Sequence, residues 1–101
     1  SATSLPLLPG VADLAKAGFC SGGSVRNRQH LGEKLRLDDH LEEFLASLCL
    51  DSETSGGLLL AVSPDKVDSL TSDLKAAGVA ECAIIGEVMA ASAIPTVHIR
   101  S

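Results

Sequence analysis

Five consecutive apolar residues, Leu-Leu-Leu-Ala-Val at positions 58–62, constrain the fold of this chain more than any other stretch. They follow directly after a polar loop that ends in two glycines. A continuous apolar run of this length is typical of a strand that is buried on both faces of a sheet. It is far shorter than the ~20 apolar residues that cross a bilayer, so we expect no membrane-spanning segment. The sequence therefore predicts a core strand over residues 58–62.

Apolar residues recur at helical spacing in three segments. Four of them between positions 41 and 48 follow the i, i+3, i+4, i+7 pattern of a helix that packs on a core. Pro64 suits the first turn of another helix, and Gly78 suits its end. The expected helices cover residues 9–17, residues 38 or 39 to 48, and residues 63–78.

Short apolar stretches predict three further strands. They lie around residues 34–37, around residues 83–85 and over residues 96–100, where Val97 and Ile99 face one way and His98 the other. Residues 58–88 have the length of a strand–helix–strand crossover, although the two strands can also pair antiparallel. Since 101 residues suit one domain, we predict a single α/β or α+β domain over residues 1–101. We expect this domain to contain a mixed sheet of about four strands, together with about three helices.

Charge and aromatic content exclude one class of partner. Lys and Arg total 8 against 13 Asp and Glu, which gives a net charge of −5, and the aromatic residues are two Phe. A nucleic-acid-binding surface needs basic residues and aromatic platforms on which bases stack. We therefore expect no nucleic-acid partner.

The sequence lacks the common motifs of a self-contained active site. It contains no GxxxxGK[ST] or GxGxxG nucleotide loop and no HExxH or GxSxG motif. Its three Cys form no CxxC pair, which argues against a disulfide framework or a zinc site and favours a reducing, cytoplasmic setting. The three His are scattered, so we expect each to be an ordinary exposed or hydrogen-bonded residue.

One loop does carry the ingredients of a metal or phosphate site. Asp51 offers carboxylate oxygens of the kind that Mg²⁺ prefers, and Thr54 and Ser55 add hydroxyls. The backbone N–H groups of Gly56 and Gly57 can turn toward an anion with no Cβ in the way. The same residues also fit an Asx-type turn before a strand, and both interpretations stay open.

A second glycine-bearing segment has similar ingredients without a carboxylate. Gly22, Gly23, Ser24 and Asn27 belong to residues 19–27, whose composition predicts a loop. The functional interpretation is an anion-binding loop. The alternative is a flexible connection between a helix and a strand.

Residues 50–62 closely resemble the signature of the C-terminal domain of selenophosphate synthetase, or selenide, water dikinase, which typically reads Asp-Pro-Gln-Thr-Ser-Gly-Gly-Leu-Leu. Three further stretches are similar to this family in the same order, so the resemblance covers nearly the whole chain. They are residues 5–10 with 17–19, residues 22–27, and residues 85–88.

The resemblance implies a fold like the C-terminal domain of aminoimidazole ribonucleotide synthetase. It also implies an ATP-dependent phosphotransferase that converts ATP, selenide and water into selenophosphate, AMP and phosphate with Mg²⁺. Selenophosphate is the selenium donor for selenocysteine synthesis. Enzymes of this family are homodimers, and their N-terminal domain carries the nucleophile and most of the ATP contacts. We therefore expect this chain to be the C-terminal domain, to work with its own N-terminal domain, and to be inactive alone.

The resemblance also implies roles for individual residues. It places the metal-binding aspartate of the family on Asp51, whereas Ser52 and Glu53 replace the usual Pro and Gln and leave the loop less rigid and more acidic. The residues implied to bind the nucleotide are Thr54, Ser55, Gly56 and Gly57 along the phosphate-facing wall and Gly22, Gly23, Ser24 and Asn27 in the same cleft.

Two other functions stay open. The chain can be a free-standing, non-catalytic binding module that docks a partner through residues 5–8 or through the helix face that carries Phe44. It can also belong to another ATP-dependent member of the aminoimidazole ribonucleotide synthetase superfamily. A nucleotide-binding half encoded upstream of Ser1 would favour the enzyme over the module.

Overall fold

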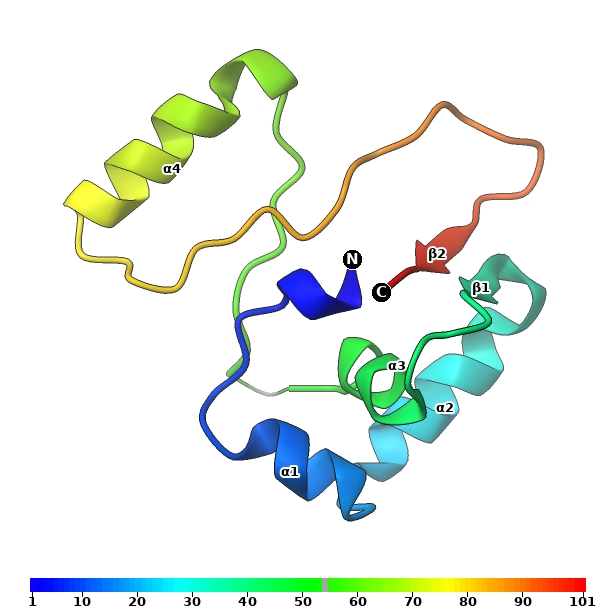
Figure 1. Ribbon diagram of the computed structural model, residues 1–101. Coiled ribbons are helices and arrows are strands. Elements are labelled where there is room, and N and C mark those ends of the chain that lie inside the picture. Colours follow the sequence, from blue (N-terminus) through cyan, green and yellow to red (C-terminus); the bar gives the residue numbers. More distant parts are fainter. Residues whose placement is uncertain (54) are drawn as a thin grey trace.

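The structure of the chain is a computed structural model that describes residues 1–53 and 55–101. Helices make up most of its regular structure (Figure 1). The α-helices are α1 (Val11–Lys16), α2 (Gly22–Leu31), α3 (Glu43–Cys49) and α4 (Val67–Ala76). The strands are β1 (Leu35–Leu37) and β2 (Val97–Ile99), and the short 3₁₀ turns are η1 (Ala2–Ser4), η2 (Gly32–Lys34) and η3 (Pro64–Lys66).

Strands β1 and β2 form a parallel pair that joins the first third of the chain to its last residues. Leu35 lies opposite Val97, and Leu37 lies opposite Ile99. The backbone N–H of Ala2 donates to the Arg100 carbonyl at 2.6 Å, so η1 also lies against this end of the chain. The N- and C-termini consequently lie close together (Figure 1).

The hydrophobic core lies where this strand pair meets η1 and α3. Ala2, Leu50 and Ile99 are buried there, at 2%, 7% and 8% exposure. Six partly buried side chains pack against them: Leu31, Leu35, Leu37, Leu41, Leu45 and Cys49. Because Leu50 is anchored in this core at the end of α3, the residue that follows it is held in place.

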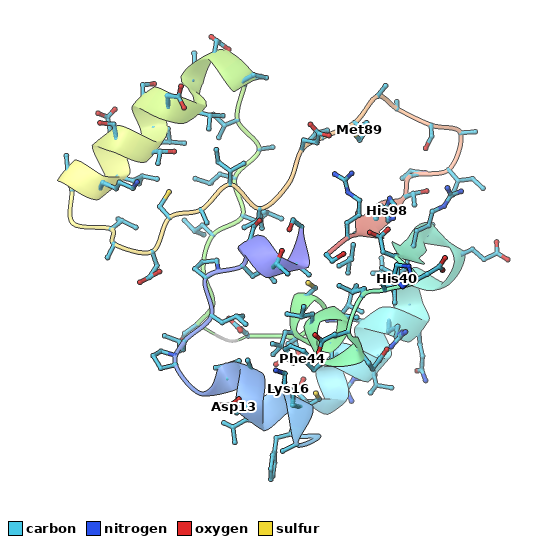
Figure 2. The ribbon with its side chains drawn as sticks, in the orientation of Figure 1. Asp13, Lys16, His40, Phe44, Met89 and His98 are labelled. Carbon is cyan, nitrogen blue, oxygen red and sulfur yellow. The ribbon has the colours of Figure 1, made fainter. Side chains whose placement is uncertain are left out.

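Helix α1 packs against α3 through small residues. Ala15 on α1 and Ala46 on α3 are both buried, and small side chains let two helix backbones approach closely. At the edge of this contact, the Lys16 ammonium lies 4.7 Å from the centre of the Phe44 ring (Figure 2). A cation over an aromatic face adds an electrostatic attraction to the packing.

The prediction of about four strands is wrong for the part of the chain that the structure describes, where the sheet has two. The strands expected near residues 34–37 and 96–100 are confirmed as β1 and β2. Residues 58–62 and 83–85 form no strand, and Leu58 and Leu59 are 89% and 81% exposed instead of buried. The physical reason is that an apolar run becomes a strand only when a neighbouring strand satisfies its backbone N–H and C=O groups.

The predicted loop over residues 19–27 is also wrong, because Gly22 begins helix α2. Ser21 caps this helix: its hydroxyl accepts a hydrogen bond from the Ser24 backbone N–H at 3.3 Å. Such a cap satisfies one of the N–H groups that a helix start leaves free. The cap therefore outweighs the low helix propensity of two glycines in the first turn.

The other predicted helices are confirmed with shifted boundaries. α1 and α4 are followed by Gly18 and Gly78, whose φ angles of +90° and +88° lie in the left-handed region that favours glycine. α3 begins at Glu43, later than the predicted Asp38 or Asp39. The reason is that the Asp38 N–H donates to the Ile99 carbonyl at 3.1 Å, which extends the strand pairing by one residue.

Helix α4 stands apart from α1–α3 (Figure 1). One extended segment leads into it from the α3 side of the chain, and another leads from it to β2. These segments carry exposed apolar side chains, among them Leu60, Val88 and Met89; Met89 is labelled in Figure 2. Within the described residues, no helix is long and apolar enough to span a membrane.

The core assignment predicts a contrast between two residues of β2. Ile99→Ala should lower the free energy of unfolding by about 2–4 kcal/mol, because it removes buried methyl groups and leaves a cavity. Val97→Ala should cost about 1 kcal/mol or less, since Val97 is 48% exposed on the same strand. Urea unfolding of the 101-residue chain measures both values. Equal losses would contradict the placement of the core.

Candidate functional site

Asp51 comes two residues after the end of α3, and its carboxylate lies at the N-terminus of α2. The oxygen Oδ1 accepts hydrogen bonds from the Ser21 hydroxyl, from the Ser24 hydroxyl at 2.9 Å and from the Ser52 backbone N–H at 3.0 Å. The side chain of Asp51 is partly exposed. The carboxylate is therefore held by neighbouring hydroxyls and still reaches the surface.

Two further contacts hold α2 against the same loop. The Asn27 side-chain amide donates to the Leu50 carbonyl at 2.8 Å. Gly23 is buried against Ser52, and a Cβ at Gly23 would lie 1.9 Å from the Ser52 hydroxyl oxygen. Glycine is thus required for this close approach. Segment 22–27 thus meets the start of the other segment that the sequence singled out, at Asp51 and Ser52.

Hydrogen bonding favours the ionised form of Asp51. The Ser21 hydroxyl has the largest effect and lowers the pKa of the carboxyl group below its ordinary value of 3.8. Partial burial acts in the opposite direction, while the Ser24 hydroxyl and the Ser52 N–H lower the pKa further. Asp51 therefore carries a full negative charge at neutral pH.

The glycine end of the loop has a different environment. Ser55, Gly56 and Gly57 are exposed, and Thr54 lies outside the described residues. A Cβ at Gly56 would lie 2.8 Å from a carboxylate oxygen of Glu53, whereas one at Gly57 would meet nothing within 4 Å. Glu53, which departs from the family motif, thus lies next to the first of the two glycines.

The donor set around Asp51 fits one part of a magnesium site. Mg²⁺ is usually bound through one or two carboxylates, with water and substrate phosphates completing its shell. Asp51 offers such a carboxylate with hydroxyl groups beside it. Among the described residues, no group of three or more His, Cys, Asp or Glu side chains can hold a metal. A cation at Asp51 would need further ligands, such as water and phosphate oxygens.

A shallow hollow lies elsewhere, between α1 and α3. It has a volume of about 460 Å³ and is lined by residues that include Lys16, Phe44 and Glu43. Asp51 does not line it. We favour Asp51 over this hollow as the site, because the hollow is open to solvent and Asp51 lies where segment 22–27 contacts the loop after α3.

Histidine and cysteine side chains serve structural roles at the positions where the structure gives them partners. His98 Nε2 lies 2.8 Å from Asp38 Oδ1 and links the two strands, as expected of a hydrogen-bonded histidine. Cys49 packs at the core, and burial raises the pKa of its thiol. A thiol with a raised pKa is a weak nucleophile at neutral pH.

Sequence reasoning missed Ser21, which contacts Asp51 and caps α2. The available signal was a serine directly before a segment that contains a second serine three residues later. Serine is a favoured N-cap residue, but the following glycine pair indicated a loop and concealed the helix start.

Comparison with known proteins identifies the family of the chain. Residues 11–97 match the model of the AIR synthase related protein, C-terminal domain family, and the chain belongs to this family. The chain is 42% identical over 74 residues to a selenide, water dikinase of Nitratidesulfovibrio vulgaris. These 74 residues make up 73% of the chain and 21% of that protein. It is 40% identical over 86 residues to the selenide, water dikinase of Pseudomonas straminea. These 86 residues make up 85% of the chain and 24% of that protein.

These relatives confirm the predicted resemblance to the C-terminal domain of selenophosphate synthetase. The chain spans about a quarter of the length of the curated relatives it matches. No solved structure matches the chain.

The lowered pKa of Asp51 predicts a pH effect on stability. Because the pKa is lower in the folded state, the unfolded chain binds more protons as the pH falls through about 4. This contribution to stability is present above that pH and is lost as the pH falls through the folded-state pKa. Asp51→Asn should therefore show a smaller loss of unfolding free energy between pH 5 and pH 3 than the unchanged chain, measured by urea unfolding. An identical loss would contradict the hydrogen-bond assignment.

Thiol reactivity tests the environment of Cys49. With one equivalent of iodoacetamide at pH 8, exposed Cys20 should be alkylated at least about ten times faster than Cys49, which burial keeps protonated. Peptide mass spectrometry separates the two sites. Comparable rates at both would show that α3 does not protect its last residue.

Proposed function

We propose that this chain is the C-terminal domain of a selenide, water dikinase, and that Asp51 supplies a metal-binding carboxylate at a site shared with an N-terminal domain. The complete enzyme converts ATP, selenide and water into selenophosphate, AMP and phosphate. The observation that carries the proposal is the hydrogen-bonded, ionised Asp51 at the junction of two motifs, in a chain whose relatives are named selenide, water dikinase.

Phosphoryl transfer depends mainly on the positioning of the phosphates and on cations that neutralise their charge. When bound, Mg²⁺ supplies that neutralisation. The residues of this chain hold the cation and orient its ligand: Asp51 binds the cation, and the start of α2 fixes the Asp51 carboxylate. Segment 55–57, which begins four residues after Asp51, is exposed. With Thr54, which lies outside the described residues, it is the part of the motif that we assign to the phosphates.

The nucleophile and most ATP contacts come from the N-terminal domain, so this chain alone is inactive. The enzyme is a cytoplasmic homodimer that takes ATP and selenide as substrates, and its product is the selenium donor for selenocysteine synthesis.

The two domains of the proposed enzyme need a surface at which they contact each other. This chain exposes 7871 Å², compared with about 5,400 Å² for a compact domain of its 10.4 kDa mass. The excess fits a surface that a neighbouring domain covers.

The same excess surface favours one alternative, a non-catalytic module that binds a protein partner. Apolar side chains are exposed at residues 58–60 and 88–89, and exposed apolar surface is typical of interaction sites. A coding sequence with a nucleotide-binding half directly upstream of Ser1 would support the enzyme. An in-frame stop codon at that place would support the module.

Asp51→Asn in the complete enzyme should lower kcat/KM for ATP at least about 100-fold. A metal's charge stabilisation is worth several kcal/mol, and each 1.4 kcal/mol corresponds to a factor of ten in rate. The assay is selenide-dependent formation of AMP at several Mg²⁺ concentrations.

Asp73→Asn is the matched control, because Asp73 is an exposed carboxylate on α4. It should leave the rate unchanged. Full activity and unaltered Mg²⁺ dependence in the Asp51 variant would remove this residue from the mechanism.

A further inference from the structure

We propose that Glu53 sets the affinity of this chain for the nucleotide: its carboxylate lies against Gly56 and repels the phosphates that approach segment 55–57. This inference rests on the proposed function, which assigns that segment to the phosphates. The proposed function gives Glu53 itself no role, and Glu53 is a position at which this chain departs from the family motif.

The Glu53 side chain fills the space that a glycine leaves open. A Cβ at Gly56 would lie 2.8 Å from Oε2 of Glu53 and 3.0 Å from its Cβ. At Gly57, by contrast, a Cβ would meet nothing within 4 Å. Glycine lets a backbone approach a ligand closely, and its N–H group can then face an anion. In this chain, a carboxylate already occupies the open side of one of the two glycines.

The charge of Glu53 has no cationic partner among the described residues. The ion pairs there join Arg28 to Glu43 and His98 to Asp38. A glutamate side chain carries a negative charge at neutral pH. Two like charges about 4 Å apart in water repel each other by an amount that corresponds to about fivefold in an equilibrium constant. Glu53 thus adds an unpaired negative charge beside the segment that we assign to the phosphates.

Asp51 and Glu53 engage different parts of the structure. Asp51 accepts hydrogen bonds from the hydroxyls of Ser21 and Ser24 at the start of α2. Glu53 is exposed and contacts Gly56 further along the loop. Exposed side chains change rotamer within nanoseconds, so the Glu53 carboxylate can move aside when an anion binds. It therefore weakens nucleotide binding without blocking it.

The test measures binding of a non-hydrolysable ATP analogue, with Mg²⁺ present, to the complete enzyme by isothermal titration calorimetry. Glu53→Gln removes the charge and keeps the shape of the side chain. We expect the dissociation constant of the analogue to fall about three- to tenfold. Because salt screens exposed charges, this difference should shrink when KCl rises from about 50 mM to about 500 mM.

Glu33→Gln is the matched control. Glu33 is an exposed glutamate on η2, which follows the C-terminal end of α2, whereas the loop contacts the N-terminal end. This variant should leave the dissociation constant unchanged. An unchanged dissociation constant for Glu53→Gln would overturn the proposal. A higher one would overturn it too, because the carboxylate would then contribute to binding.

Gly57→Asp, compared with Gly57→Ala, separates this inference from the proposed function. Both side chains fit, since a Cβ at Gly57 meets nothing within 4 Å. The added charge should weaken binding of the analogue about three- to tenfold relative to Gly57→Ala. If it does so while Glu53→Gln changes nothing, the role of Glu53 is wrong and the assignment of segment 55–57 stands. If neither charge change alters binding, that assignment fails and the role of Glu53 fails with it.

Discussion

The hydrogen bonds between Asp51 and the start of α2 connect two segments that are 30 residues apart in the chain. Each partner depends on the other. The Ser21 hydroxyl caps a helix whose first turn contains two glycines, and the same hydroxyl donates to the carboxylate. A negative charge at a helix N-terminus is also favoured by the helix dipole. The same hydroxyl and carboxylate groups thus contribute to three effects. They start α2, they hold it against the end of α3, and they favour the ionised form of Asp51.

The core determines where this contact forms. β1 and β2 pair in parallel and bring Ile99 against Leu50, and Leu50 is the residue directly before Asp51. Because Leu50 is anchored in the core, the carboxylate is placed by the fold of the first fifty residues and the last five. The segments between residues 56 and 96 hold exposed apolar side chains that the chain itself leaves uncovered. In the proposed enzyme, this surface is where a second domain contacts the chain.

Much of this arrangement follows from local sequence signals. Pro64 and Gly78 mark the region of α4, the apolar spacing around Phe44 marks α3, and the resemblance of residues 50–62 identifies the family. Two expectations failed because they depend on information beyond a short window. A strand over residues 58–62 requires a pairing partner, which no periodicity reveals. The start of α2 depends on a capping hydroxyl that outweighs the loop preference of two glycines. The meeting of Ser21 with Asp51 depends on tertiary packing, so spacing alone does not predict it.

A crystal structure of the complete enzyme with Mg²⁺ and a non-hydrolysable ATP analogue would show whether Asp51 binds the cation. We expect a cation at a bonding distance of about 2.0–2.1 Å from one carboxylate oxygen of Asp51, with the Ser21 and Ser24 hydroxyls on the other oxygen. A structure in which every cation is bound by other residues, and Asp51 contacts only its neighbours in this chain, would contradict it.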